Sequence, residues 1–113
     1  MILKEITNKE FEKYAKTHQY YTFHQTKEWA ELKAKNGWGH IYVGMYENNK
    51  VIGCSLILSK KLPVIKKQIF YAPRGFLIDY HNESLVTEFT KQLKQLLKSK
   101  NGIFVKIDPP LMY

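Results

Sequence analysis

Apolar residues along this chain of 113 recur with two periods, and the changes of period divide the chain into strands and helices. Ile2–Ile6 predicts a short strand. Beyond it, Phe11, Tyr14 and Ala15 are spaced like residues on one face of a helix. We expect Asn8 to cap this helix, because its side-chain oxygen can accept a hydrogen bond from the unpaired N–H groups of the first turn.

A second helix is expected after an irregular segment. His18–Gln25 holds three aromatic residues without a clear period, which indicates a loop. Thr26 then caps a helix that has Glu28 in its first turn, where the helix dipole favours a carboxylate. Asn36-Gly37 supplies the stop signal of this helix.

The middle of the chain is rich in strand signals. Alternation in Ile41–Tyr46, a polar turn over Glu47–Lys50 and an apolar run over Val51–Leu58 predict a hairpin. Lys60–Pro63 breaks that run, and Gln68–Ala72 predicts a further strand. These segments are expected to pair in one sheet.

The strongest helical pattern covers Glu83–Lys98, with Asn82 as its cap and Asn101-Gly102 at its end. Its apolar stripe is expected to consist of Leu85, Phe89, Leu93 and Leu96. A last strand, Ile103–Ile107, looks central in the sheet because it is so apolar, and we expect more chain to follow it. The order β-α-α-β-β-β-α-β predicts an α/β (α+β) fold with helices flanking a mixed sheet.

Composition narrows the class of protein. The formal net charge of +8 suits anionic partners such as nucleic acid, phosphorylated substrates or an anionic membrane face, although most lysines are expected on solvated helix faces. No apolar run approaches the roughly 20 residues that span a bilayer. The single cysteine, Cys54, excludes an internal disulfide, and the N-terminus lacks a signal-peptide layout. We therefore expect a cytoplasmic protein.

The run Tyr71–Tyr80 contains Arg74, the only arginine of the chain. A guanidinium grips phosphate or carboxylate with a flat fork of donors, whereas a lysine is a point charge. Arg74 precedes a glycine, so a sharp turn could present it at a sheet edge as a ligand-binding residue. The structural alternative is an ion pair with Asp79 that holds the turn.

Asp108 follows the last predicted strand and precedes two prolines. Open α/β sheets bind ligands at the carboxyl ends of their strands, so this carboxylate could act as an acid or base there. The alternative is a turn aspartate that bonds its own backbone.

Two tryptophans also stand out. Trp29 and Lys33 share a helix face, which also fits an aromatic ring on the core with a lysine laid along it. Trp38 lies between two glycines and could stack on a ligand or anchor its loop. The four histidines show no metal spacing, Cys54 is expected to be buried, and no phosphate-binding glycine loop is present in the sequence.

Several short motifs, taken in order, resemble the opening of the Fem family of peptidoglycan bridge-forming aminoacyltransferases. A hairpin and an amphipathic helix stand between them in the same order as in that family. The motifs are Phe23–Lys33, Gly37-Trp38, Ala72–Gly75 with Leu77–Tyr80, and Phe104–Pro109.

This resemblance implies a GNAT-like (acyl-CoA N-acyltransferase-like) fold, with residues 1–113 as a partial domain, the N-terminal subdomain, and the second domain absent. The implied reaction moves an amino acid from aminoacyl-tRNA to the stem-peptide amine of a peptidoglycan precursor, either lipid II or a nucleotide-linked muropeptide. The resemblance implies no metal or organic cofactor. It does imply that the protein can associate peripherally with the inner membrane face. Substrate contacts would come from Lys33, Arg74, Trp38 and Tyr71, and Asp108 would lie near the attacking amine.

Such two-domain enzymes form their site between halves, so the chain alone is expected to be inactive until a second domain or partner chain completes it. The alternative from another class is a basic RNA-binding or interaction module without catalytic activity. It predicts tRNA binding that depends steeply on salt and not on Asp108.

Overall fold

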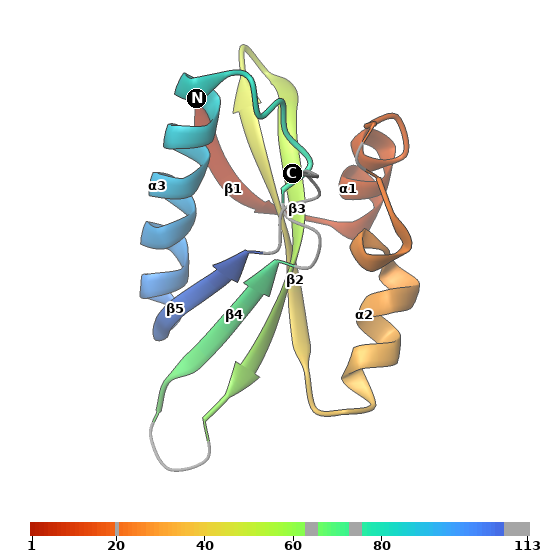
Figure 1. The fold of residues 1–113 in the computed structure, drawn as a ribbon, viewed down its shortest axis with the longest axis vertical. Coiled ribbons are helices and arrows are strands. Elements are labelled where there is room, and N and C mark those ends of the chain that lie inside the picture. The colour runs from red at the N-terminus through yellow and green to blue at the C-terminus, as the bar shows by residue number, and fades with distance from the viewer. Residues whose placement is uncertain (20, 63–65, 73–75, 108–113) are drawn as a thin grey trace.

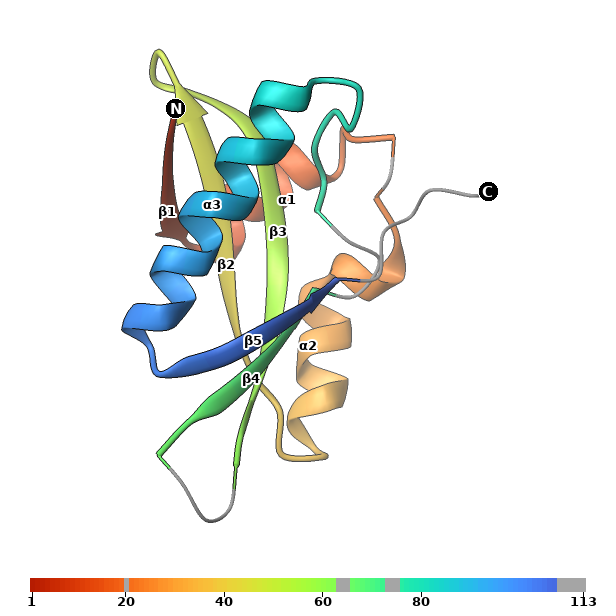
Figure 2. The ribbon, with the colours of Figure 1, turned by 60° about the vertical axis from the view of Figure 1, so that its left-hand side comes forward.

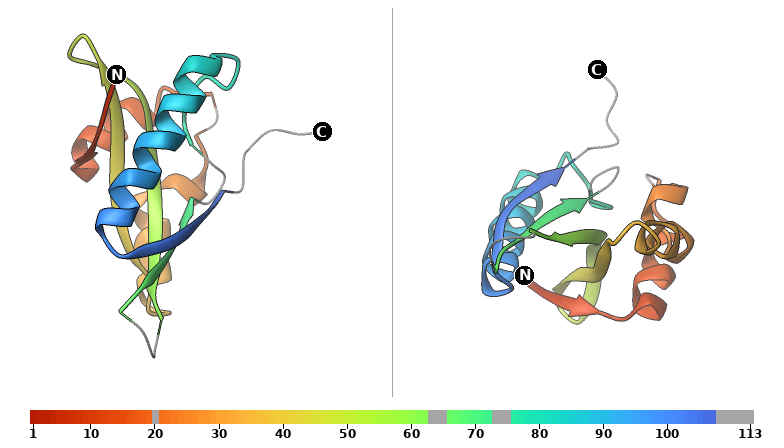
Figure 3. Two further views of the ribbon diagram at one scale, coloured as in Figure 1. Left: turned by 90° about the vertical axis from the view of Figure 1, so that its left-hand side faces the viewer. Right: turned by 90° about the horizontal axis from the view of Figure 1, so that it is seen from below.

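A computed structural model of the chain describes residues 1–19, 21–62, 66–72 and 76–107, and for residues 23 and 103–107 it describes the backbone only. The described part forms three layers. A single sheet lies between one helix on one face and two helices on the other (Figures 1 and 3). This arrangement confirms the predicted mixed sheet flanked by helices.

The sheet has the strand order β1-β2-β3-β4-β5. Its strands are β1 (Ile2–Ile6), β2 (Gly39–Glu47), β3 (Lys50–Lys61), β4 (Gln68–Ala72) and β5 (Gly102–Ile107). The first four pair antiparallel, and β5 pairs parallel to β4. Among the described strands β5 is therefore an edge strand, and the central place expected for it is not seen within them.

The helices are α1 (Asn8–Ala15), the short 3-10 helix η1 (Phe23–Gln25), α2 (Lys27–Ala34) and α3 (Glu83–Ser99). The caps Thr26 and Asn82 were predicted correctly, since each side chain accepts a hydrogen bond from the first turn of its helix. The segment predicted as an irregular loop contains η1. Within the described ranges, no helix combines the length and the apolar character needed to cross a membrane.

The cap of α1 corrects the sequence analysis. Thr7, not Asn8, is the N-cap, and Asn8 is the first helical residue. The Thr7 hydroxyl accepts a hydrogen bond from the Glu10 backbone N–H at 3.2 Å, and the Glu10 carboxylate accepts one from the Thr7 backbone N–H, also at 3.2 Å. This reciprocal capping box satisfies two backbone donors, so Thr7 is the better cap.

The core on the α3 side is centred on the apolar stripe of that helix. The buried stripe consists of Leu85, Phe89, Leu93 and Leu97. Leu96 was predicted in place of Leu97 and is only partly buried at the edge of this cluster, because the turn of the helix carries Leu97 further toward the sheet. The ring of Phe89 lies 4.5 Å from that of Phe76, between centroids.

The opposite face of the sheet is covered by α1 and α2. The buried residues of this second cluster are Ile6, Phe11, Ala15, Ala30, Tyr42, Cys54, Leu56 and Leu77. Cys54 is fully buried, as predicted, and burial raises the pKa of its thiol. Burial also raises the pKa of Tyr42 to about 12.

Candidate functional site

The candidate site begins where β4 and β5 end. Ala72 pairs with Ile107, so the two parallel strands finish opposite each other, as Figure 2 shows. In the sequence, Arg74 follows Ala72 by two positions and Asp108 follows Ile107 directly. Both predicted residues lie outside the described part of the chain, so their roles remain predictions.

Beside this point the pairing between β3 and the chain after β4 changes register. Leu58 on β3 pairs with Tyr71, and Cys54 bridges to Leu77. Four positions separate Cys54 from Leu58, whereas six separate Tyr71 from Leu77. The chain after β4 therefore has two more residues than a continuous ladder needs, and the sheet is interrupted where the predicted Arg74 turn begins.

Gln25 fills the place of the missing ladder bonds. Its side-chain oxygen accepts a hydrogen bond from the Leu56 backbone N–H at 2.7 Å, and its amide nitrogen donates to the Leu56 carbonyl at 3.3 Å. Leu56 lies midway between Cys54 and Leu58, so its backbone groups face the interruption. Gln25 is fully buried, and its amide thus acts as a substitute for one residue of a neighbouring strand.

Tyr80 fixes the far side of the interruption. Its hydroxyl accepts a hydrogen bond from the Phe76 backbone N–H and donates one to the Phe76 carbonyl, each at 2.8 Å. Asp79 accepts a hydrogen bond from the backbone N–H of His81, which stabilises the following turn. The chain is therefore held by β4 before the predicted Arg74 turn and by Tyr80 after it.

Tyr71 is half-buried on β4, between Leu58 on β3 and Lys106 on β5. Side chains of directly paired residues share a face of a sheet, and alternate residues of one strand do so too. Tyr71 thus lies on the same face as Leu58 and Leu56, which is the face that α1 and α2 cover.

Lys33 lies on α2, on that same side of the sheet. Its ammonium is 5.0 Å from the ring centroid of Trp29, which itself packs against the α1–α2 core cluster. This arrangement matches the structural interpretation, an aromatic ring on the core with a lysine laid along it. The lysine is half-exposed and retains donors that can reach an anion.

Trp38 joins α2 to β2. Its backbone N–H donates to the Lys33 carbonyl at 3.2 Å, and Gly37 before it adopts the left-handed conformation with φ of 84°. The ammonium of Lys60 lies 5.3 Å from the Trp38 ring centroid. The structure thus places Lys33 and Trp38 together at the end of α2, with Tyr71 on the same side of the sheet.

Sequence reasoning missed two residues near the candidate site, Gln25 and Tyr80. Both stand inside the motifs that carry the resemblance, which was the available signal. The sequence around Gln25 and Tyr80 has no periodic pattern that would indicate a buried polar side chain. In the ranges described, no three His, Cys, Asp or Glu side chains gather as metal ligands.

Comparison with known proteins agrees with the family resemblance seen in the sequence. Residues 6–113 match the sequence model of the FemAB family. The lipid II:glycine glycyltransferase of Staphylococcus epidermidis is 30% identical over 104 residues, which are 92% of this chain and 25% of that protein. This chain thus spans about a quarter of the length of the curated relatives it matches.

Solved structures agree at the level of the fold. A crystal structure of FemX superposes with a TM-score of 0.85 at 30% identity and covers 98% of this chain and 28% of its own. A GNAT family acetyltransferase of Staphylococcus aureus superposes with a TM-score of 0.62 at 14% identity over 95% of this chain and 84% of its own. The predicted GNAT-like fold is therefore confirmed.

Proposed function

The chain belongs to the FemAB family, and from this premise we propose that it forms the N-terminal part of a peptidoglycan aminoacyltransferase. The donor is an aminoacyl-tRNA, and the acceptor is the stem-peptide amine of lipid II or of its nucleotide-linked precursor. The reaction takes place in the cytoplasm at the inner membrane face. Related lipid II:glycine glycyltransferases and the FemX fold support the acceptor class.

The observation that carries the proposal is the parallel end of β4 and β5. Ala72 and Ile107 lie opposite each other, and each belongs to a motif of the family resemblance, Ala72–Gly75 and Phe104–Pro109. Ligands of open α/β sheets bind at the carboxyl ends of strands. Gln25 and Tyr80 hold the described backbone beside this end, at Leu56 and Phe76.

The proposed step is aminolysis of an ester. The acceptor ammonium first loses a proton, and its nitrogen then attacks the aminoacyl carbonyl carbon. A tetrahedral oxyanion forms and collapses, an amide bond replaces the ester bond, and the ribose oxygen of the tRNA leaves with a proton. Asp108 would accept the proton or hold the amine in line, and a group of the substrate could serve instead. The phosphates of the precursor would be bound by Arg74 and Lys33, with Trp38 and Tyr71 beside them.

The proposal is tested by titrating the purified chain with a soluble nucleotide-linked muropeptide. We expect saturable binding that Arg74→Lys weakens by about ten- to a hundredfold, since the lysine loses the two-point grip. Lys91→Arg, which keeps the charge on an exposed α3 position, is the matched control and should bind like the wild type. Equal binding by wild type and Arg74→Lys would contradict the assigned role of Arg74.

A second experiment addresses catalysis. With the remaining domains of a full-length relative joined to residues 1–113, Asp108→Asn should lower turnover and leave the thermal midpoint unchanged. The 113-residue chain alone should show no transfer. Full turnover of Asp108→Asn, or tRNA-dependent transfer by the short chain, would refute these assignments.

A further inference from the structure

We propose that a basic pocket where β3 ends and β4 begins binds the phosphate headgroups of an anionic membrane surface. This inference deepens the proposed function, on which it rests, because a lipid-linked acceptor must be met at a membrane. The pocket has a volume of about 320 Å³ and is lined by Lys61, Leu62, Lys66, Lys67, Gln68 and Asn101.

The backbone around the pocket is firmly held. The Leu62 N–H donates to the Lys67 carbonyl at 3.0 Å, which closes the ends of the two strands on each other. The Gln68 N–H donates to the Asn101 carbonyl at 2.9 Å, and the Gln68 side chain donates to the Lys100 carbonyl at 2.8 Å. The strand ends are thereby fixed to the turn between α3 and β5.

The charge of this pocket is not compensated within the described part of the chain. There, Lys61, Lys66 and Lys67 form no ion pair. Two neighbouring lysines do have partners: Lys100 pairs with Glu5 at 3.0 Å, and the ammonium of Lys60 lies over the Trp38 ring. Three lysines therefore line the pocket, and its described lining residues include no carboxylate.

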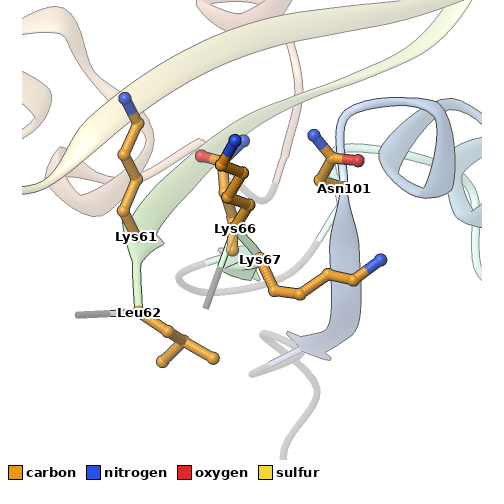
Figure 4. A pocket seen from close by; sticks show the side chains of 6 residues that line it. Lys61, Leu62, Lys66, Lys67 and Asn101 are labelled. Atoms are coloured by element: carbon orange, nitrogen blue, oxygen red, sulfur yellow. The ribbon is translucent and has the colours of Figure 1, made fainter. Parts of the chain in front are cut away.

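Figure 4 shows how these side chains lie. Lys61 and Lys66 run in the same direction from the two strand ends, while Lys67 extends on the side of Asn101. The Asn101 carboxamide adds an uncharged donor to the rim. The lining thus offers ammonium and amide donors to phosphate oxygens.

The chemistry of the lining favours a bilayer over a nucleic acid. Lysines are strongly hydrated point charges that suit mobile headgroups, and each contributes to attraction by an anionic leaflet. Leu62 adds an apolar contact, and the described lining residues include no aromatic ring on which a base could stack. In the sequence, the residues that join Leu62 to Lys66 are also apolar, although they lie outside the described residues and outside the proposed site.

The position of the pocket also suits a flat partner. The described part of the chain extends 40 × 31 × 27 Å, and the end of β3 and the start of β4 lie at one end of the long axis (Figure 1). A strand rises about 3.3 Å per residue, so Gln68 and Ala72 are about 13 Å apart. The candidate site would thus stand close above the membrane surface and face a lipid-linked substrate.

The test is co-sedimentation with vesicles of phosphatidylcholine alone and of an equimolar mixture with phosphatidylglycerol. We expect wild type to bind only the mixed vesicles, and Lys61→Gln/Lys66→Gln/Lys67→Gln to lower its partition coefficient roughly a hundredfold. The matched control Lys9→Gln/Lys13→Gln/Lys16→Gln removes the same charge from exposed positions of α1 and its C-cap, and should lose less than about tenfold. Circular dichroism checks folding, and Lys66→Gln/Lys67→Gln replaces the triple variant if that variant is unfolded.

Two further arms identify the source of the phosphate. Soluble glycerol phosphate should not saturate the protein, and tRNA binding should fall equally in the pocket and control variants. The proposal is overturned by equal vesicle losses in both variants, by saturation with glycerol phosphate without vesicle binding, or by loss of tRNA binding confined to the pocket variant. The vesicles contain no precursor, so failure here is distinguishable from failure of the muropeptide titration.

Discussion

Replacement of Gln25 by leucine should strongly destabilise the fold, because its amide occupies the interruption of the sheet. The side chain is fully buried and makes hydrogen bonds of 2.7 and 3.3 Å to the N–H and C=O of Leu56. Leucine has a similar volume and can form neither bond. Gln25→Leu therefore tests the hydrogen bonds rather than a cavity.

The expected loss follows mainly from the Leu56 N–H, because the Leu56 carbonyl still accepts a hydrogen bond from the Ser55 hydroxyl at 3.1 Å. A buried donor without a partner costs about 1–3 kcal/mol, so the variant should lose about 1–3 kcal/mol of unfolding free energy. Small domains have only about 5–15 kcal/mol in total. A loss of this size should be plain in a denaturant titration.

The assay is urea unfolding followed by circular dichroism and tryptophan fluorescence, with linear extrapolation of the free energy. Amide exchange of the Leu56 N–H, measured by NMR, reports the lost bond directly. Gln95→Leu, at an exposed position of α3, is the matched control and should stay within about 0.5 kcal/mol of the wild type.

Gln25→Glu separates hydrogen bonding from shape. At neutral pH a carboxylate can accept from the Leu56 N–H but cannot donate to the Leu56 carbonyl. Burial raises the pKa of such a carboxyl above its unfolded value, so stability should recover as the pH falls below the folded pKa. The reasoning is refuted if Gln25→Leu is as stable as the wild type and Leu56 exchange is unchanged.

Three other predictions concern the core. Gly102→Ala should lose about 1–3 kcal/mol in thermal unfolding, because its Cβ would lie 2.7 Å from both the Leu97 carbonyl oxygen and the Phe70 ring; an unchanged midpoint would contradict this contact. Cys54, whose thiol pKa is raised by burial, should resist a thiol reagent at neutral pH and react fully in urea, and fast native labelling would argue against its burial. Burial raises the pKa of Tyr42 from 10.0 to about 12, so the folded state holds the phenol proton more tightly than the unfolded state does. The free energy of unfolding should therefore fall between about pH 10 and pH 12. Tyr42→Phe should lessen that fall, and an identical fall in both proteins would contradict the assignment.

Local signals predicted most element boundaries. Thr26 and Asn82 were recognised as caps because a capping side chain acts on backbone groups only three residues away. The prediction failed at Asn8, where Thr7 and Glu10 together form a better cap. It failed again at Leu96, because adjacent leucines leave the helix face ambiguous and the sheet selects one of them.

The candidate site was predictable only where a motif was informative. Lys33, Trp38 and Tyr71 were singled out from the sequence, and the structure describes where each lies, while their role in substrate binding stays a prediction. Arg74 and Asp108 lie outside the described residues, so their contribution awaits the binding and turnover experiments. The basic pocket was not predicted, since Asn101 joins the strand ends only through the packing of α3 and β5.

The sequence by itself determined the order of elements, the mixed sheet with flanking helices and the resemblance to a transferase family, because these depend on local periods, caps and short motifs. The tertiary structure decided that β5 lies at an edge of the described sheet and that the Gln25 side chain hydrogen-bonds the backbone of β3 at Leu56. Gln25 and Leu56 are 31 positions apart, and no local pattern encodes a bond between them. Such a partner is selected only once the sheet has formed and left backbone groups that must be satisfied.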